Sequence, residues 1–600
     1  MKKLITVFMA GSVLSLSAQA AELSSSGACS VSEKWNFNAS VGETYRDEYA
    51  RFLKGKANSA HTYVQATTLS ETSAKAEGKL FADYWHARAL FEANLTGLAF
   101  KGFEKLVSVA PSRDTLGVQV AGWECLNRIH EAHPAMSFSD ELSSALPSFF
   151  MTRLTDANKQ TLWEAAFNVL NTQVAENRSP DDISTTLGLM SGSGAYQAFA
   201  TAVVASHQNA HAQTIAALEP AFKAAIPAPL KREQDRARLL LARAYYSLGQ
   251  YDQAATQYDK VDRKSNEAAE MLSEMSWSYL QSERYSEAVG TATHLQVGGL
   301  RNTYAPEANL VLAMSLNELC QYQDSLRATQ LLEQTYRPSY EWLKAWSTSK
   351  KPLYNEAIQY LQNKSDTTIP ARVAGEWIRS SVFLANQDEI HRLFTEDKAT
   401  QALAAQGAQE EANLAQELKK LAGHARLGIR EEGGSLKVYA DSAEAAEQAP
   451  VKLKEGVNQY NRMHSASMEW QYMAGQEEKE AKSLQSKLVQ EINADLSRRN
   501  MQMLAQLTNV AENRKLIDIE IFNGASHDMI WRNAHPDFEE KAKLMMTEVK
   551  KPIPGHVWDW GKIRPNQGKV EIWEDELGSF KAHLTDNCAN KEKYLALQQK

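Results

Sequence analysis

The stretch ARLLLARAYYSLGQYDQAATQYDKV, residues 237–261, decides the fold that the sequence predicts. Its apolar residues recur with helical spacing on both sides of Leu248-Gly249-Gln250, a segment typical of a tight turn. The stretch therefore predicts two helices joined by a short turn. Small residues at Ala242 and Ala254 would let these helices approach closely, because helix axes come together where side chains are small.

The same pattern recurs further along the chain. The tyrosine that opens the second helix returns at intervals of 34, 37 and 32 residues, giving the set Tyr251, Tyr285, Tyr322 and Tyr354. Three residues after these tyrosines stand Ala254, Ala288, Ser325 and Ala357, and nine residues before them stand Ala242, Ser276, Ala313 and Ala345. One helical hairpin cannot bury both of its faces, so we expect the hairpins to stack in a row.

This pattern resembles the tetratricopeptide repeat (TPR). The first copy matches the family pattern at Ala242, Tyr245, Gly249, Tyr251, Ala254, Tyr258 and Val261. The second copy has Glu283 where the turn glycine belongs, and the fourth has Pro352 late in its first helix, which disturbs helical regularity. More degenerate hairpins are predicted from Tyr84 and around 198–222, before and after a loop at 191–194.

The expected fold class is all-α, with a TPR-like α-solenoid followed by long helices and a small mixed α/β C-terminal module. The predicted divisions are degenerate hairpin repeats at 35–230, a TPR core at 231–365, the end of the solenoid at 366–430, a long helical hairpin at 445–515 and the C-terminal module at 516–600.

The resemblance to TPR proteins implies that the first helices of successive hairpins line a groove that binds a protein segment. The matching positions are Arg236, Leu239, Arg243, Tyr246, Glu270, Ser273, Trp277, Leu280, Glu307, Leu310, Met314 and Asn317. Arg, Tyr, Trp and Met are enriched at binding hot spots. The alternative is that these residues pack against a neighbouring helix of the same chain.

Two segments after the repeats have different patterns. Val451–Ala474 and Glu477–Lys515 are amphipathic and predict a helical hairpin, with a self-standing coiled coil as the alternative. Leu516–Phe522 alternates apolar and charged residues, as a strand does. The tail, with WEDELGSF at 573–580 and Cys588, also resembles periplasmic TPR proteins of the myxobacterial gliding-motility machinery, which implies a role in motility as an expectation.

The first twenty residues, MKKLITVFMAGSVLSLSAQA, have the pattern of a secretory signal peptide: two lysines, an apolar stretch and small residues at Ala18 and Ala20. Without them the chain carries 63 basic and 73 acidic residues, a net charge of −10 that disfavours nucleic acid and anionic lipid as partners. No later stretch approaches the roughly 18 apolar residues of a membrane span. We therefore expect a periplasmic protein, soluble or peripherally associated with the envelope.

No pattern of catalytic, metal-binding or cofactor-binding residues stands out. His207 and His211 lack both a third ligand and the glutamate of a zinc-protease motif, and Ser193 lacks the glycine of a nucleophile elbow. The predicted function is a non-catalytic scaffold whose partners are envelope proteins, with no cofactor and no metal. The alternative is a protein that binds or acts on peptidoglycan through the Trp-rich tail, because tryptophans can stack on sugar rings.

The four cysteines, Cys29, Cys125, Cys320 and Cys588, allow three full disulfide pairings in an oxidising compartment. Their spacing does not choose among the pairings. We favour Cys29 with Cys125, because both lie in the N-terminal region while Cys320 falls at a predicted turn.

Export predicts that the purified protein begins near Ala21 and is released by osmotic shock without detergent. Intact mass of the N-terminal peptide measures this directly. A lipid on Cys29 would contradict the prediction, because Ser26-Gly27-Ala28-Cys29 would then be an acylation site.

Overall fold

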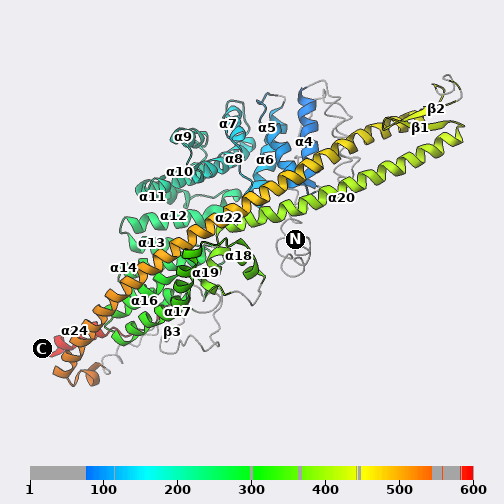
Figure 1. Ribbon diagram of the computed structural model, residues 1–600. Helices are drawn as coiled ribbons and strands as arrows, with labels where there is room; N and C mark the ends of the chain where they lie inside the picture. The colour runs from blue at the N-terminus through cyan, green and yellow to red at the C-terminus, as the bar shows by residue number, and fades with distance from the viewer. Residues whose placement is uncertain are drawn as a thin grey trace. The chain divides into compact units, whose positions relative to one another are not determined.

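The computed structural model describes residues 76–92, 94–113, 115–265, 267–296, 300, 302–362, 368–440, 442, 447–542, 557–558, 581–582 and 584–598. The predicted signal peptide, Cys29, the part of the first repeats before residue 76 and most of the Trp-rich tail lie outside these residues. The described residues are mostly helical, as the sequence predicts, with two small two-stranded sheets (Figure 1).

The chain divides into two compact units, each built from two separate segments. Unit 1 comprises residues 1–193 and 385–489, and unit 2 comprises residues 194–384 and 490–600. The first boundary lies in the loop at 191–194 that the sequence marks as a separator. The other boundaries differ from those predicted, because each unit combines a block of short helices with part of two very long ones.

In unit 1 the short helices follow one another along the chain. They are α4 (Ala76–Glu92), α5 (Thr96–Val107), α6 (Leu116–Ala132), α7 (Asp140–Phe150), α8 (Asp156–Ala175) and α9 (Pro180–Leu189). α4 packs against α5, α5 against α6, and α6 against α8. Gly102 makes the first of these contacts close, since a Cβ placed on it would lie 2.8 Å from the Cβ of Ala87. The helix–turn–helix predicted from Tyr84 is therefore confirmed.

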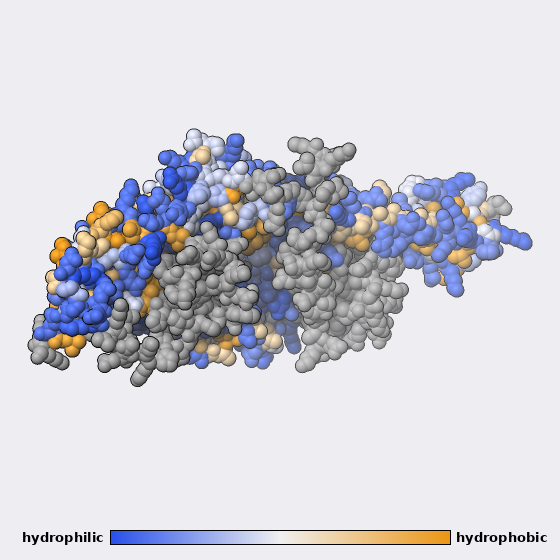
Figure 2. All heavy atoms as spheres, turned by 90° about the horizontal axis from the view of Figure 1, so that it is seen from below, coloured by the Kyte–Doolittle hydropathy of each residue, from blue (hydrophilic) through white to orange (hydrophobic). Residues whose placement is uncertain are grey.

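A β-hairpin in unit 1 connects two long helices. They are α20 (Ser381–His424) and α22 (Val451–Ala534), and the strands between them are β1 (Gly428–Glu432) and β2 (Ser435–Tyr439), paired antiparallel. Gly433 and Gly434 form the two-residue turn with φ of 59° and 81°, as a type I′ turn requires. Leu418, Leu436 and Leu453 join the hairpin to both helices in a small core. The surface around the β-hairpin and the adjoining helix ends is mostly hydrophilic (Figure 2).

The continuity of α22 corrects two predictions. The expected hairpin at 445–515 is one uninterrupted helix, and Leu516–Phe522 is helical and not a strand. In that stretch Ile517 and Ile521 are buried, and these positions are four apart. A period of two and a period near four share this spacing, so the alternation alone did not distinguish strand from helix.

In unit 2 the helices again pack mainly against their neighbours along the chain. They are α10 (Ala195–His207), α11 (His211–Ala221), η3 (Ala228–Glu233), α12 (Gln234–Ser247), α13 (Tyr251–Tyr258), α14 (Ala268–Gln281), α15 (Tyr285–His294), α16 (Pro306–Glu318), α17 (Tyr322–Ser349), α18 (Tyr354–Leu361) and α19 (Ala371–Ile378). Each α-helix from α10 to α17 contacts the next (Figure 1). The tail adds the two-residue strands β3 (Val557–Trp558) and β4 (Lys581–Ala582), paired parallel, and α24 (Asn587–Gln598).

The small residues singled out from the sequence lie in the helix contacts. All but one are fully buried, namely Ala242, Ala254, Ser276, Ala288, Ala313, Ser325 and Ala357. The exception is Ala345, which is exposed because α17 runs unbroken through the point where a turn into a fourth hairpin was expected. The predicted register therefore holds for three hairpins and fails at the fourth.

The turns between paired helices share one backbone conformation. The second residue after each first helix has a positive φ, and the residue that follows it donates its N–H to a carbonyl five positions back, as in a Schellman motif. At α12–α13 these residues are Gly249 (φ 73°) and Gln250, and at α14–α15 they are Glu283 (φ 58°) and Arg284. Asn94, Asn209 and Cys320 occupy the same position in three other turns. The missing glycine in the second copy has not changed the turn.

A disulfide anchors the C-terminal helix to one of these turns. Cys320 is bonded to Cys588, with Cα atoms 5.3 Å apart and a sequence separation of 268. The backbone N–H of Asn587 also donates to the carbonyl of Leu319 at 3.0 Å. Only one of the three full pairings contains this bond, and that pairing joins Cys29 to Cys125. Because Cys29 lies outside the described residues, the second bond stays a prediction.

The shared turn predicts opposite effects of two substitutions. Glu283→Gly should raise the free energy of unfolding by about 1 kcal/mol, because a non-glycine residue with positive φ carries roughly that strain. Gly249→Ala should lower it by a similar amount. Urea denaturation of both variants measures the effect, and equal shifts of the same sign would contradict the shared conformation.

Candidate partner-binding surface

The twelve residues predicted to line a groove lie on three helices of unit 2, α12, α14 and α16, and fall into three groups by exposure. Arg236 and Glu270 are exposed. The half-buried residues are Arg243, Tyr246, Ser273, Trp277, Glu307, Met314 and Asn317. The buried residues are Leu239, Leu280 and Leu310, which belong to the core between the helices. A partner could therefore reach the first two groups but not the third.

Arg243 holds neighbouring helices together by ion pairs. Its Nη2 lies 2.7 Å from Oε1 of Glu270, and its Nε donates to Oε2 of Glu274 at 3.0 Å. Burial alone would lower the pKa of Arg243, but the attraction and hydrogen bonds of these two carboxylates outweigh burial and raise the pKa. The sequence suggested that Arg243 could grip a carboxylate of a partner. In the structure, the carboxylates that pair with Arg243 belong to α14.

Glu274 was not among the predicted residues, although it binds two side chains of neighbouring helices. Besides pairing with Arg243, it accepts a hydrogen bond from the hydroxyl of Tyr258 at 2.9 Å. Burial and the neighbouring Glu274 raise the pKa of Tyr258, so this tyrosine stays a hydrogen-bond donor. Glu274 lies one helical turn after Glu270, and this i, i+4 spacing was the available sequence signal that both carboxylates face the same way.

Three of the half-buried side chains, Tyr246, Trp277 and Met314, are aromatic or apolar, and the other four are polar or charged. Arg243, Trp277 and Met314 occupy equivalent positions on α12, α14 and α16, and all three are half-buried. The ring of Tyr246 lies edge-on to that of Tyr251, with centroids 5.2 Å apart. These helices therefore present a row of large side chains beside the charged Glu270.

Part of the same row is covered by α22, within unit 2. The hydroxyl of Tyr304 donates to the carbonyl of Met503 at 2.9 Å, and Nε2 of Gln506 donates to Oε1 of Glu307 at 2.8 Å. The alternative that predicted groove residues contact a neighbouring helix of the same chain therefore holds for Glu307, as it does for Arg243 and for the three buried leucines.

A third contact of α22 reaches α19. The indole Nε1 of Trp377 donates to Oδ1 of Asn500, a fully buried side chain, at 2.7 Å. Because Trp377 is itself fully buried, this bond satisfies an indole N–H that water cannot reach.

α22 also completes the N-terminus of a short helix. α18 begins after Leu353, which has no side chain able to cap it. Oδ1 of Asn493 accepts the backbone N–H groups of Leu353 and Tyr354 at 2.8 and 2.9 Å. The first N–H groups of a helix have no partner within the helix, so this side chain supplies the missing acceptor.

In unit 1, α20 likewise supplies the acceptor for the first N–H groups of α5. The residue before α5 is Leu95, and Glu396 accepts the N–H groups of Gly97 and Leu98 at 3.1 and 3.0 Å. Arg392 pairs with both Glu396 and Glu389, and all three side chains are largely buried. Nothing in the sequence marked this cluster, because charges at i, i+3 and i+7 are equally typical of a solvated helix face.

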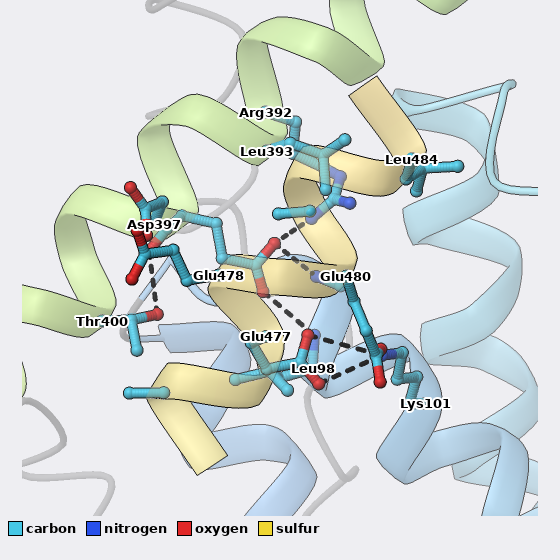
Figure 3. A pocket seen from close by; sticks show the side chains of 14 residues that line it. Leu98, Lys101, Arg392, Leu393, Asp397, Thr400, Glu477, Glu478, Glu480 and Leu484 are labelled. Carbon is cyan, nitrogen blue, oxygen red and sulfur yellow. Dashed lines mark hydrogen bonds and ion pairs between the residues drawn. The ribbon is translucent and has the colours of Figure 1, made fainter. Parts of the chain in front are cut away.

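A cavity of about 220 Å³ lies beside this cluster (Figure 3). Lys101 of α5 reaches Glu477 and Glu480 of α22, with Nζ–carboxylate distances of 3.0 and 2.9 Å. Burial would lower the pKa of Lys101, but the hydrogen bonds and charges of the two glutamates raise it. The two cationic side chains at the cavity, Lys101 and Arg392, are thus both paired with carboxylates, and the pairs of Lys101 hold α5 against α22.

No arrangement for metal binding was found among the described residues, where no three His, Cys, Asp or Glu side chains could hold an ion. His207 ends α10 and His211 begins α11, so the two histidines flank a turn instead of sharing a helix face. In the described part of the chain, no helix combines the length and the apolarity needed to cross a membrane.

Comparisons of the chain with models of protein families, with curated proteins and with solved structures found no match.

The cap on α18 predicts that Asn493→Ala destabilises the protein by about 1–2 kcal/mol, since two N–H groups lose their acceptor. Asn493→Asp keeps an acceptor and should cost less. Thermal and urea unfolding compare the two variants. Equal losses would mean that the amide nitrogen, and not Oδ1, makes the important contact.

Proposed function

We propose that this chain is a non-catalytic scaffold of the bacterial envelope whose TPR-like helical row in unit 2 binds a segment of a partner protein. The observation that carries the proposal is the row of equivalent, half-buried large side chains Arg243, Trp277 and Met314 on successive first helices. Such a row gives a bound segment a regular series of contacts along the solenoid axis.

The repeated construction of the hairpins supports a TPR-like α-solenoid. Small residues fill the contacts of three hairpins, and the same Schellman turn links their helices. Where a TPR array would add further hairpins, α17 continues and α22 packs on α16 instead. The open part of the groove is therefore proposed on α12 and α14 and on the α16 residues that α22 leaves half-exposed.

The chemistry of this surface favours a partner segment with apolar and basic side chains. Tyr246, Trp277 and Met314 offer apolar and aromatic area, the kind that contributes most at protein interfaces. Arg243 is already neutralised by Glu270 and Glu274, so the local charge that remains for a partner is negative. A basic residue next to an apolar anchor would match both features.

The location of the scaffold follows from the signal-like first twenty residues, and we propose the periplasm as its compartment. The Cys320–Cys588 bond is consistent with an oxidising compartment. The motility-related role implied by the tail stays an expectation, since most of the tail lies outside the described residues.

The proposal predicts that Tyr246→Ala with Met314→Ala weakens capture of envelope proteins by crosslinking in intact cells. Two truncated contacts of this kind cost about 2–4 kcal/mol, or a loss of roughly thirty-fold or more in affinity. These residues are half-exposed, so the helicity measured by circular dichroism should not change.

The matched control is Leu248→Ala with Leu361→Ala, which truncates two exposed apolar residues outside this surface. The control should capture partners as the wild type does. Equal capture by the test variant would place the binding surface elsewhere. Retention of the purified chain on insoluble peptidoglycan, unaffected by either pair of substitutions, would favour the alternative that the protein acts on the cell wall.

A further inference from the structure

The C-terminal part of α22 has an apolar face that packs against nothing in the described part of unit 2. Five large apolar side chains there are between 57% and 64% exposed, namely Leu516, Ile519, Phe522, Met529 and Ile530. At roughly 100° per residue these positions fall within an arc of about 140°. The opposite side of the helix is buried, at Val510, Ile517 and Ile521. Figure 2 shows apolar surface at the left end, where α24 and the end of α22 lie.

The exposed face has the seven-residue order of a helix that pairs with another helix. Leu516, Asn523 and Ile530 are seven residues apart and form one line, with Ile519 and Ser526 between them. The residues that flank this line are also seven apart, Phe522 and Met529 on one side and Glu520 and His527 on the other. All nine residues are exposed.

We propose that a second copy of this chain packs antiparallel on this face of α22. Across an antiparallel two-fold axis, Ile530 meets the partner's Ile519, Asn523 meets the partner's Ser526 and Phe522 meets the partner's Met529. Glu520 meets the partner's His527 on the other flank. Each contact occurs twice because the interface is the same patch on both subunits.

On the flanks the antiparallel arrangement pairs apolar side chains with one another, although in the seam it sets Leu516 against the partner's Asn533. In a parallel pair Phe522 would face the partner's His527. The parallel pair would instead add an ion pair between Lys515 and the partner's Glu520. A solvent-exposed ion pair contributes little to stability. Burial of Phe522 against the partner's Met529 adds apolar area and a sulfur–aromatic contact. In one antiparallel register, Phe522 faces the partner's Met529 on one flank and Glu520 faces the partner's His527 on the other. Because the same patch complements itself in this way, we infer that a second copy of the chain binds this face.

The face covers about four helical turns, so the interface is smaller than the roughly 800 Å² per partner of a standard interface. We therefore expect a dissociation constant on the order of micromolar. The dimer is independent of the proposed partner binding, because the α22 face and the surface on α12, α14 and α16 share no residue.

Sedimentation equilibrium of the exported full-length chain tests the proposal. The wild type should dimerise with a micromolar constant. Ile519→Glu should weaken dimerisation more than about ten-fold, because it buries two charges in the seam. Met501→Glu makes the same kind of change at an exposed apolar position of α22 outside the face and should have no effect.

Charge substitutions test the orientation. His527→Glu should weaken the dimer, because each Glu520 then faces a second carboxylate, introduced at position 527 of the partner. Adding Glu520→Lys to this variant should restore dimerisation. Lys515→Glu should change nothing in an antiparallel dimer, whereas it would weaken a parallel one.

Two results would overturn the proposal. A wild type that stays monomeric up to about 100 µM would exclude a micromolar dimer. A monomeric wild type whose melting temperature falls on Ile519→Glu would show that the face is covered within the same chain. Partner capture by Ile519→Glu in intact cells, measured separately, should equal that of the wild type, so a failed dimer and a failed scaffold function give different results.

Discussion

In each unit, a long helix supplies the hydrogen-bond acceptor for the first N–H groups of one short helix. The first N–H groups of a helix need acceptors, and leucines precede α5 and α18, so neither helix is capped by the residue before it. Glu396 supplies the acceptor for α5 and Asn493 supplies it for α18. Both acceptors lie on long helices, α20 and α22, which place these side chains against the short helices that they complete. Polar contacts of this kind fix where along the long helix the short helix packs, which apolar contacts alone do not specify.

Within unit 2, close packing of paired helices follows from size rather than polarity. Ala242 and Ala254 are fully buried where α12 meets α13, and larger residues fill the space toward the next pair. The turn between the helices tolerates more variation, because Glu283 adopts the same left-handed conformation as Gly249. The side chains in the contact therefore constrain the repeat more tightly than the turn residue does.

The same packing explains what is left for function. The core takes Leu239, Leu280 and Leu310, and α22 covers the part of the row around Glu307. What stays half-exposed is the line Arg243, Trp277 and Met314, with Arg243 neutralised by α14. A scaffold built in this way would offer a partner an apolar and mildly acidic surface, and the exposed face of α22 would offer a second, separate one.

The sequence by itself determined the helical class, the paired helices of unit 2 and the small residues at their contacts, because these follow from local periodicity and side-chain size. Tertiary structure decided everything that depends on distant residues: the single helix across 451–534, the ion pairs of Arg243, the caps from Asn493 and Glu396, and the bond between Cys320 and Cys588. A strand-like alternation at 516–522 became helix because α22 continues through it with one face packed. Whether a charged or apolar residue is buried depends on which helix, distant in sequence, packs against it, and the local sequence does not contain that information.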